Sequence, residues 1–140
     1  MLKLFRIANF LSRNHIPFLP KIIYYFNRIF FSVVLPASTK VGKNVIFGYH
    51  GLGIVVHPRV VIGDGVVIGT NVTIGGRSKI YSVPVIGNHT VIGTGAKILG
   101  PIKVGHHVDI GANAVVVNDV PDYAVVVGIP AKVIRIKNDC

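Results

Sequence analysis

The feature that most constrains this sequence is an apolar residue at every sixth position. Eleven successive positions at this spacing hold Val or Ile: Val56, Ile62, Ile68, Ile74, Ile80, Ile86, Ile92, Ile98, Val104, Ile110 and Val116. A period of six fits neither an α-helix nor a half-buried strand. It is typical of short β-strands joined by tight turns in a solenoid, with three sides to each triangular coil of about 18 residues. We predict that these side chains point into the prism and stack from coil to coil.

Two further positions of the repeat support this interpretation. The fifth position is mostly small or β-branched and is predicted to fill the interior near each corner: Val60, Val66, Val72, Ser78, Thr90, Ala96, Val108, Ala114 and Val120. The fourth position favours residues that tolerate a positive φ, as a corner turn requires. It holds Gly65, Asn71, Arg77, Val83, His89, Gly95, Pro101, His107, Asn113 and Asp119. His89 and His107 are 18 residues apart and should stack on adjacent coils.

The repeat has two irregular stretches, and insertions in solenoids often form loops on the binding face. Phe47 and Val56 are nine positions apart, so about three residues are inserted near 48–53, a stretch that contains His50. Residues 76–84 keep the six-residue phase but lack the usual small residues. We predict that this second stretch bulges outward as a loop.

Residues 1–35 lack the repeat and are predicted to form two short helices. Pro17 and Pro20 separate a first apolar segment from a second one, which runs from Lys21 to about Val34. Pro20 suits a helix start. Basic residues interrupt the apolar run well short of about 18 residues, so we expect no membrane-spanning helix.

The charge of this helical arm leaves two interpretations open. The first acidic residue of the chain is Asp64, and eight Lys or Arg residues precede it. The helices either pack on the main domain or a neighbouring subunit, or they form a basic amphipathic hairpin on an anionic membrane face. We therefore include peripheral membrane contact through residues 1–35 among the expectations.

The composition favours anionic partners, because the chain has 15 Lys and Arg against 5 Asp and Glu. Nucleic acid is not expected, since the basic residues are scattered and the repeat offers no aromatic stacking platform. Cys140 is the only cysteine, which excludes an internal disulfide and favours a reducing compartment. We expect a cytoplasmic protein, at the inner face of the membrane if the arm binds lipid.

Four sequence runs resemble the hexapeptide-repeat acyltransferases, within them the serine acetyltransferase-like and polysaccharide O-acetyltransferase groups. The runs are residues 50–56 (HGLGIVV), 72–76 (VTIGG), 92–100 (IGTGAKILG) and 127–134 (VGIPAKVI). The resemblance implies an all-β fold, a left-handed parallel β-helix, here over residues 36–128 after the helical arm 1–35 and before a C-terminal tail 129–140. It also implies a homotrimer, acetyl-CoA in the groove between adjacent prisms, and a histidine base, for which His50 occupies the matching position.

The departures from the serine enzymes concern the acceptor. Tyr49 stands where those enzymes have Asp before the histidine, and Ser82-Val83 stands near the place of their Arg-His pair. No acid precedes Asp64 to orient the base. We therefore expect a sugar hydroxyl of a surface polysaccharide or its precursor as the acceptor. L-serine is the alternative, and a catalytically inactive scaffold is the second alternative.

Acetyl transfer from acetyl-CoA to a hydroxyl requires a base, stabilisation of an oxyanion and a thiolate leaving group. A neutral imidazole suits the first task, so His50 is the expected base and His57 its rival. Backbone N–H groups near residues 51–53 or 75–76 are candidates for the oxyanion. For CoA, we expect room for the pantetheine arm and phosphate contacts from this set: Gly95, Ala96, Lys97, Lys103, Gly111, Ala112, Lys132 and Arg135. No metal is expected, because corner turns already explain His89 and His107.

Overall fold

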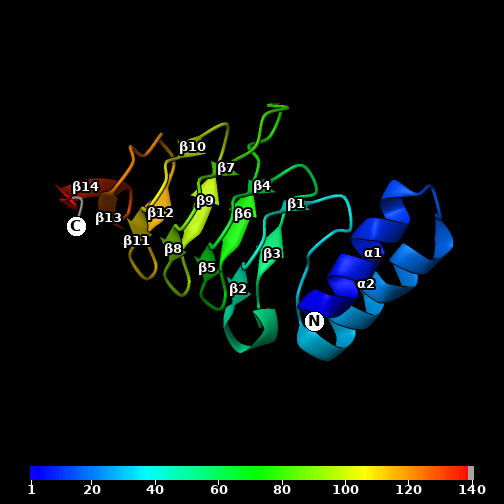
Figure 1. Cartoon of the computed structure of the whole chain (residues 1–140). Coiled ribbons are helices and arrows are strands. Elements are labelled where there is room, and N and C mark those ends of the chain that lie inside the picture. The colour runs from blue at the N-terminus through cyan, green and yellow to red at the C-terminus, as the bar shows by residue number, and fades with distance from the viewer. Residues whose placement is uncertain (139–140) are drawn as a thin grey trace.

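The computed structural model describes residues 1–138 as a helical hairpin followed by a parallel β-helix (Figure 1). The helices are α1 (Leu2–Arg13) and α2 (Phe18–Phe31), and a short 3-10 helix, η1, spans Gly48–Gly51. The strands are β1 (Lys40–Val41), β2 (Ile46–Phe47), β3 (Val55–Val56), β4 (Val61–Ile62), β5 (Val67–Ile68), β6 (Thr73–Gly75), β7 (Val85–Ile86), β8 (Val91–Ile92), β9 (Lys97–Leu99), β10 (Lys103–Val104), β11 (Asp109–Ile110), β12 (Val115–Val116), β13 (Ala124–Gly128) and β14 (Ala131–Ile136). Cys140 lies outside the described residues.

The strands stack into three sheets, which form the sides of a prism. We name each sheet by its first strand in the chain. The β1 sheet has the order β1-β4-β7-β10, the β2 sheet β2-β5-β8-β11-β13-β14, and the β3 sheet β3-β6-β9-β12. All pairs are parallel except β13 with β14. The chain visits the three sheets in turn, so each coil has one corner between each pair of sheets.

The core confirms the six-residue pattern at every position but one. Ten of the eleven Val and Ile positions are at most 3 % exposed, whereas Ile80 is 40 % exposed. The register explains the exception, because Val61 pairs with Val85 across 24 residues, whereas Val85 pairs with Lys103 across 18. One six-residue unit is extruded as the loop expected at residues 76–84, the green loop at the upper edge of Figure 1. The prediction that Ile80 points into the prism is therefore wrong.

Two of the three corners use left-handed residues at the fourth position. Their φ angles are positive at Asn44, Gly65, Asn71, His89, Gly95, His107, Asn113 and Tyr123. At the third corner, between the β3 and β1 sheets, the residues of the fourth position do not have positive φ angles. The prediction of a positive φ is therefore wrong for Arg77, Val83, Pro101 and Asp119. The expected stack of His89 on His107 is confirmed, with ring centroids 5.0 Å apart, and Tyr123 continues it at 5.0 Å from His107.

Side chains at the corner between the β1 and β2 sheets bind the backbone of the preceding coil. Asp64 accepts a hydrogen bond from the Lys43 N–H at 2.6 Å, and Asn88 accepts one from the Asp64 N–H at 2.9 Å. The ladder continues with His106 Nδ1, 2.9 Å from the Asn88 N–H, and with Asp122 Oδ1, 2.7 Å from the His106 N–H. Each coil thus satisfies a corner N–H group that the strand ladders leave unpaired.

The helical hairpin closes the N-terminal end of the prism, where α1 lies against the first coil. Phe5 and Ala8 are at most 2 % exposed. Arg6 donates to the carbonyls of Val41 and Gly42, and Asn9 Nδ2 donates to the Ala37 carbonyl at 2.6 Å. The two predicted helices are confirmed, although α2 begins at Phe18, so that Pro20 falls within its first turn. None of the helices among residues 1–138 is long and apolar enough to cross a bilayer.

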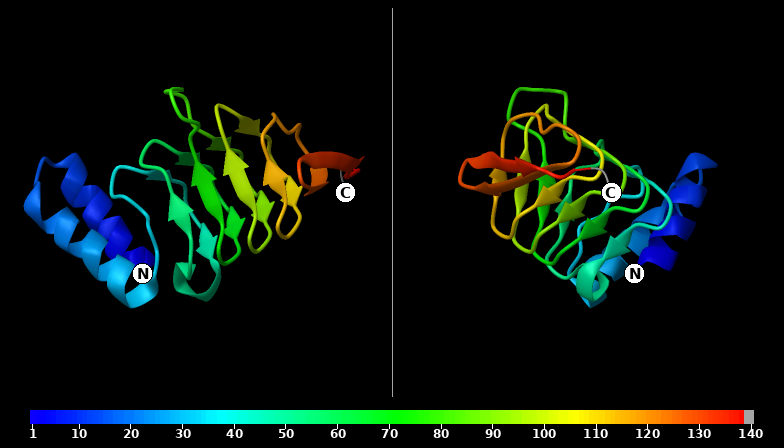
Figure 2. Two further views of the ribbon diagram at one scale, coloured as in Figure 1. Left: turned by 180° about the vertical axis from the view of Figure 1, so that it is seen from behind. Right: turned by 60° about the vertical axis from the view of Figure 1, so that its left-hand side comes forward.

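The C-terminal end of the prism is closed by a hairpin. β14 pairs antiparallel with β13, at the opposite end from the helices (Figure 2). The segment from residue 129, expected as a tail, therefore contains a strand that extends the β2 sheet.

Candidate active site

His50 lies in a turn with an unusual backbone. The turn, η1, links β2 to β3, and its φ angles are +46° at Tyr49, +59° at His50 and +89° at Gly51. For residues other than glycine, each left-handed conformation costs on the order of 1–3 kcal/mol, and such outliers cluster at functional sites. The inserted residues thus bring a strained turn and an exposed imidazole to the corner between the β2 and β3 sheets.

The surroundings of the turn hold it in place. The Gly53 N–H donates to the Ser32 carbonyl at 3.0 Å, and the Ile54 N–H donates to the Gly51 carbonyl at 3.0 Å. Gly51 is buried, and a Cβ there would lie 2.8 Å from the Met1 side chain. The bond to Ser32 uses the Gly53 N–H, so this group is not available to an oxyanion as the sequence suggested.

The His50 imidazole has no hydrogen-bond partner within residues 1–138 of this chain. Its nearest ring is that of Phe31, with centroids 5.9 Å apart. Two acidic side chains of the prism, Asp64 and Asp109, are engaged with other residues. Asp64 accepts from the Lys43 N–H, and Asp109 pairs with Lys137 Nζ at 2.9 Å. The imidazole of His50 is therefore free to meet a substrate, and no carboxylate in the described chain orients it.

His57 has a different environment. It lies at the next corner, between the β3 and β1 sheets, and its Nδ1 accepts a hydrogen bond from the Arg59 N–H at 3.2 Å. A neutral imidazole has one lone pair and one N–H group. Because this bond occupies the lone pair of Nδ1, the proton of neutral His57 is on Nε2, which is then a donor. His57 is therefore less suited than His50 to remove a proton.

Several CoA candidates lie along the same edge of the prism as His50. Lys97 begins β9, just after this edge, and its Nζ donates to the Asn71 carbonyl of the preceding coil at 2.7 Å. Ala112 is exposed at the same edge one coil further on. His57, by contrast, lies across the β3 sheet at another corner.

Three of the small residues expected to make room for pantetheine have a different task. Ala96 is fully buried and fills the prism interior. A Cβ on Gly95 would lie 2.0 Å from Asn113 Oδ1, and one on Gly111 would lie 2.8 Å from Val127. Both glycines thus lie close to side chains of the next coil. At these three positions the small residue is explained by packing within and between the coils.

The remaining candidates lie at the C-terminal end or on the third side. Lys132 and Arg135 are exposed on β14, the last strand of the β2 sheet. Lys103 lies on β10 in the β1 sheet, away from the edge that carries His50. No group of three or more His, Cys, Asp or Glu side chains in residues 1–138 is arranged to hold a metal ion.

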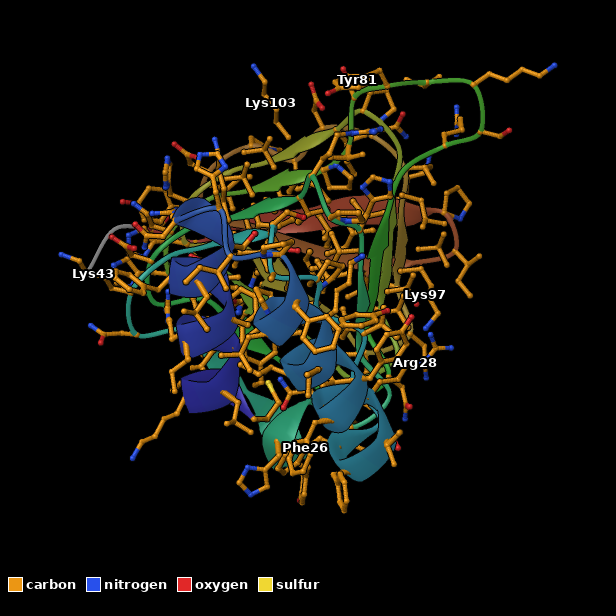
Figure 3. The ribbon with its side chains drawn as sticks, turned by 90° about the vertical axis from the view of Figure 1, so that its right-hand side faces the viewer. Phe26, Arg28, Lys43, Tyr81, Lys97 and Lys103 are labelled. Atoms are coloured by element: carbon orange, nitrogen blue, oxygen red, sulfur yellow. The ribbon has the colours of Figure 1, made fainter. Side chains whose placement is uncertain are left out.

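A cavity that the sequence did not predict lies beside the extruded loop. Its volume is about 340 Å³, and Tyr81 and Lys103 lie on the same side of the molecule (Figure 3). Arg59 Nη2 donates to the Tyr81 carbonyl at 2.6 Å, and its guanidinium lies 4.0 Å from the centre of the Tyr81 ring. Ser82 and Val83 also line the cavity. Arg59 and Tyr81 are 22 residues apart, and no motif in the sequence links them.

We predict that Arg59→Ala loosens this loop. The change removes a hydrogen bond and a cation–π contact, and trypsin can cut after Arg77 and Lys79 within the loop. Limited tryptic cleavage between residues 77 and 80 should become about tenfold faster, as loss of two such contacts would allow. The control is Lys40→Ala, which removes another exposed basic side chain, on β1 of the β1 sheet. Equal rates in Arg59→Ala and the unchanged protein would show that Arg59 does not hold the loop.

Comparisons with known proteins agree with this arrangement. Residues 84–118 match the family model described as bacterial transferase hexapeptide (six repeats). A serine acetyltransferase of Synechococcus elongatus is 37% identical over 131 residues, which cover 92% of this chain and 53% of that protein. The chain thus spans about half the length of this relative.

Solved structures extend the agreement to the fold. Serine acetyltransferase from Brucella abortus, in complex with coenzyme A, superposes with a TM-score of 0.93 at 30% identity, covering 99% of this chain and 56% of that one. Soybean serine acetyltransferase complexed with serine gives 0.89 at 35% identity, covering 95% and 55%. The predicted left-handed parallel β-helix is confirmed. The chain is thus similar to the hexapeptide-repeat acyltransferases and, among them, to the serine acetyltransferases.

Proposed function

We propose that this protein transfers an acetyl group from acetyl-CoA to a hydroxyl. One observation carries the proposal: a free imidazole, that of His50, is held on a strained turn at one edge of the prism, and Lys97 and Ala112 follow along the same edge. The similarity to serine acetyltransferases, one of them described in complex with coenzyme A, supports the choice of acetyl donor.

In this mechanism the His50 imidazole takes the proton of the acceptor hydroxyl. The hydroxyl oxygen attacks the thioester carbonyl and forms the new C–O bond, which places a negative charge on the carbonyl oxygen. Collapse of this oxyanion breaks the C–S bond and returns the carbonyl. The CoA thiolate then takes the proton from His50, so that the imidazole is neutral again and the products are an acetyl ester and free CoA.

The elongated shape of CoA suits the prism edge. The β2 sheet has six strands, and their spacing of about 4.8 Å gives about 24 Å from the His50 turn to β14. We place the thioester beside His50, the pantetheine arm past Lys97 and Ala112, and the phosphates toward Lys132 and Arg135. Because this edge is open in a single chain, a neighbouring prism would complete the groove. We propose that it does so in the homotrimer that the family resemblance implies.

L-serine is the acceptor that the comparisons favour. The relatives are named serine acetyltransferases, and the soybean structure is described as complexed with serine. This evidence weighs against our first expectation, a sugar hydroxyl. The sugar remains the second candidate because of Tyr49, which is 85% exposed beside His50, and because the described chain offers His50 no carboxylate.

The test is thiol release from acetyl-CoA with L-serine, nucleotide sugars and oligosaccharides as acceptors. We expect L-serine to raise the release rate at least about tenfold over the rate without acceptor. Sugar-dependent release without a response to serine would replace serine by a sugar and keep the mechanism. No release with any acceptor, together with no acetyl-CoA binding in calorimetry, would contradict the proposal and favour an inactive scaffold.

A further inference from the structure

The outer face of the helical hairpin is apolar and uncovered. Only Pro20 and Asn27 of α2 are buried, since α2 packs mainly on α1 and not on the prism. Large apolar side chains that are 43–75% exposed follow one another along the hairpin: Ile7, Phe10, Ile16, Phe18, Leu19, Ile22, Tyr25, Phe26, Ile29 and Phe30. Terminal caps of solenoids need a polar outer face to remain soluble. The outer face of this cap is apolar instead, which indicates that another apolar surface or a lipid layer covers it.

The charges around this face are all of one sign. Lys3, Arg13, Lys21 and Arg28 are exposed, and residues 1–35 contain no acid. Figure 3 shows Phe26 and Arg28 at separate places around α2, so the exposed ring and the exposed guanidinium lie on different sides of the helix. A helix with one apolar face and basic side chains beside it is typical of helices that lie in the plane of an anionic membrane surface.

We propose that the hairpin docks on an anionic phospholipid membrane, with α2 lying in the interface. The apolar side chains would enter the boundary between headgroups and acyl chains, and the basic ones would meet lipid phosphates. Helices of 12 and 14 residues suit this position. A symmetric contact with a second copy fits less well, because it would place like-charged faces against each other.

Docking would also bring the His50 turn close to the bilayer. Gly51 lies against Met1, and the His50 ring lies 5.9 Å from Phe31 at the end of α2. The reacting group of the proposed function is therefore at the membrane-facing end of the prism. Vesicle binding is nevertheless independent of catalysis, so its failure would leave the acetyl-transfer proposal untouched.

The test uses the full chain, because Phe5 and Val33 belong to the core and a deletion of the arm would expose it. We would measure co-sedimentation with vesicles of phosphatidylcholine containing 30 mol% phosphatidylglycerol, and with vesicles of phosphatidylcholine alone. We expect binding to the anionic vesicles only. The double variant Phe26→Glu/Ile29→Glu should lower the partition coefficient at least about tenfold, and Arg13→Glu/Lys21→Glu should lower it as well. Both pairs are exposed, so the fold, checked by circular dichroism, should persist.

Two controls separate the hairpin from general charge and apolarity. Lys79→Glu in the extruded loop and Ile136→Glu on β14 change exposed residues away from the helices and should leave the partition coefficient unchanged. Equal binding by Phe26→Glu/Ile29→Glu and the unchanged protein would overturn the proposal. A second result would also overturn it: the unchanged protein does not bind vesicles, and the variant sediments as a smaller assembly in analytical ultracentrifugation. That result would mean that the apolar face contacts a second copy of the chain.

Discussion

Replacing His50 by asparagine is expected to lower turnover of acetyl-CoA about 10²–10⁴-fold, the usual effect of removing a positioned general base. Asparagine tolerates the left-handed backbone that residue 50 adopts, so the turn should keep its shape. His50→Ala should give the same loss of activity with a small additional loss of stability. The measurement is thiol release at saturating acetyl-CoA, with the melting temperature recorded for each variant.

His57→Asn is the matched control for this prediction. The ring of His57 only receives a backbone hydrogen bond from Arg59, so its replacement should reduce turnover less than about tenfold. The opposite result, with activity surviving in His50→Asn and lost in His57→Asn, would move the base to the corner between the β3 and β1 sheets. It would also mean that the acetyl group is delivered beside the extruded loop.

The second large effect concerns stability and compares two isoleucines of the same sequence phase. Ile92 is 1% exposed and lies between the coils of Ile68 and Ile110, so Ile92→Ala should lower the free energy of unfolding by about 2–5 kcal/mol. Ile80 is 40% exposed in the extruded loop, so Ile80→Ala should change it by no more than about 0.5 kcal/mol. Urea unfolding followed by circular dichroism measures both values.

Similar losses in the two variants would contradict the register described above. They would show that the unit containing Ile80 lies within a coil and that β4 does not pair with β7. A small loss in both variants would instead mean that the prism can close over the missing atoms of Ile92. An unchanged m-value is required for either comparison, because it shows that the same surface is exposed on unfolding.

Most of the fold was predictable from the sequence because the interactions that determine it repeat. Each Val or Ile of the core meets the same neighbours one coil away, so a single period describes the whole prism. The period wrongly places Ile80 in the core, because an extruded unit of six residues leaves the phase of all later residues unchanged. The only sign in the sequence was chemical: the stretch from Gly76 to Pro84 lacks the small residues that a corner needs.

The candidate site was predictable only in part. The extra residues before Val56 drew attention to His50, but the packing of its turn against the helical arm, where Gly51 lies close to Met1 and Gly53 bonds to Ser32, has no sign in the sequence. Small residues such as Gly95 and Gly111 suggested space for a ligand, whereas the next coil already occupies that space. A one-dimensional pattern does not distinguish room left for a substrate from room left for the protein itself.

The C-terminal hairpin has a consequence for polymerisation. An open parallel β-helix ends in strands whose unpaired N–H and C=O groups are a template for a further chain, and growth at such an end yields fibres. In the β2 sheet, β14 reverses direction and places Lys132 and Arg135 along the last edge. Edge strands bearing positive charge resist the addition of another strand. The basic residues that we assign to CoA phosphates would thus also keep one prism from extending into the next.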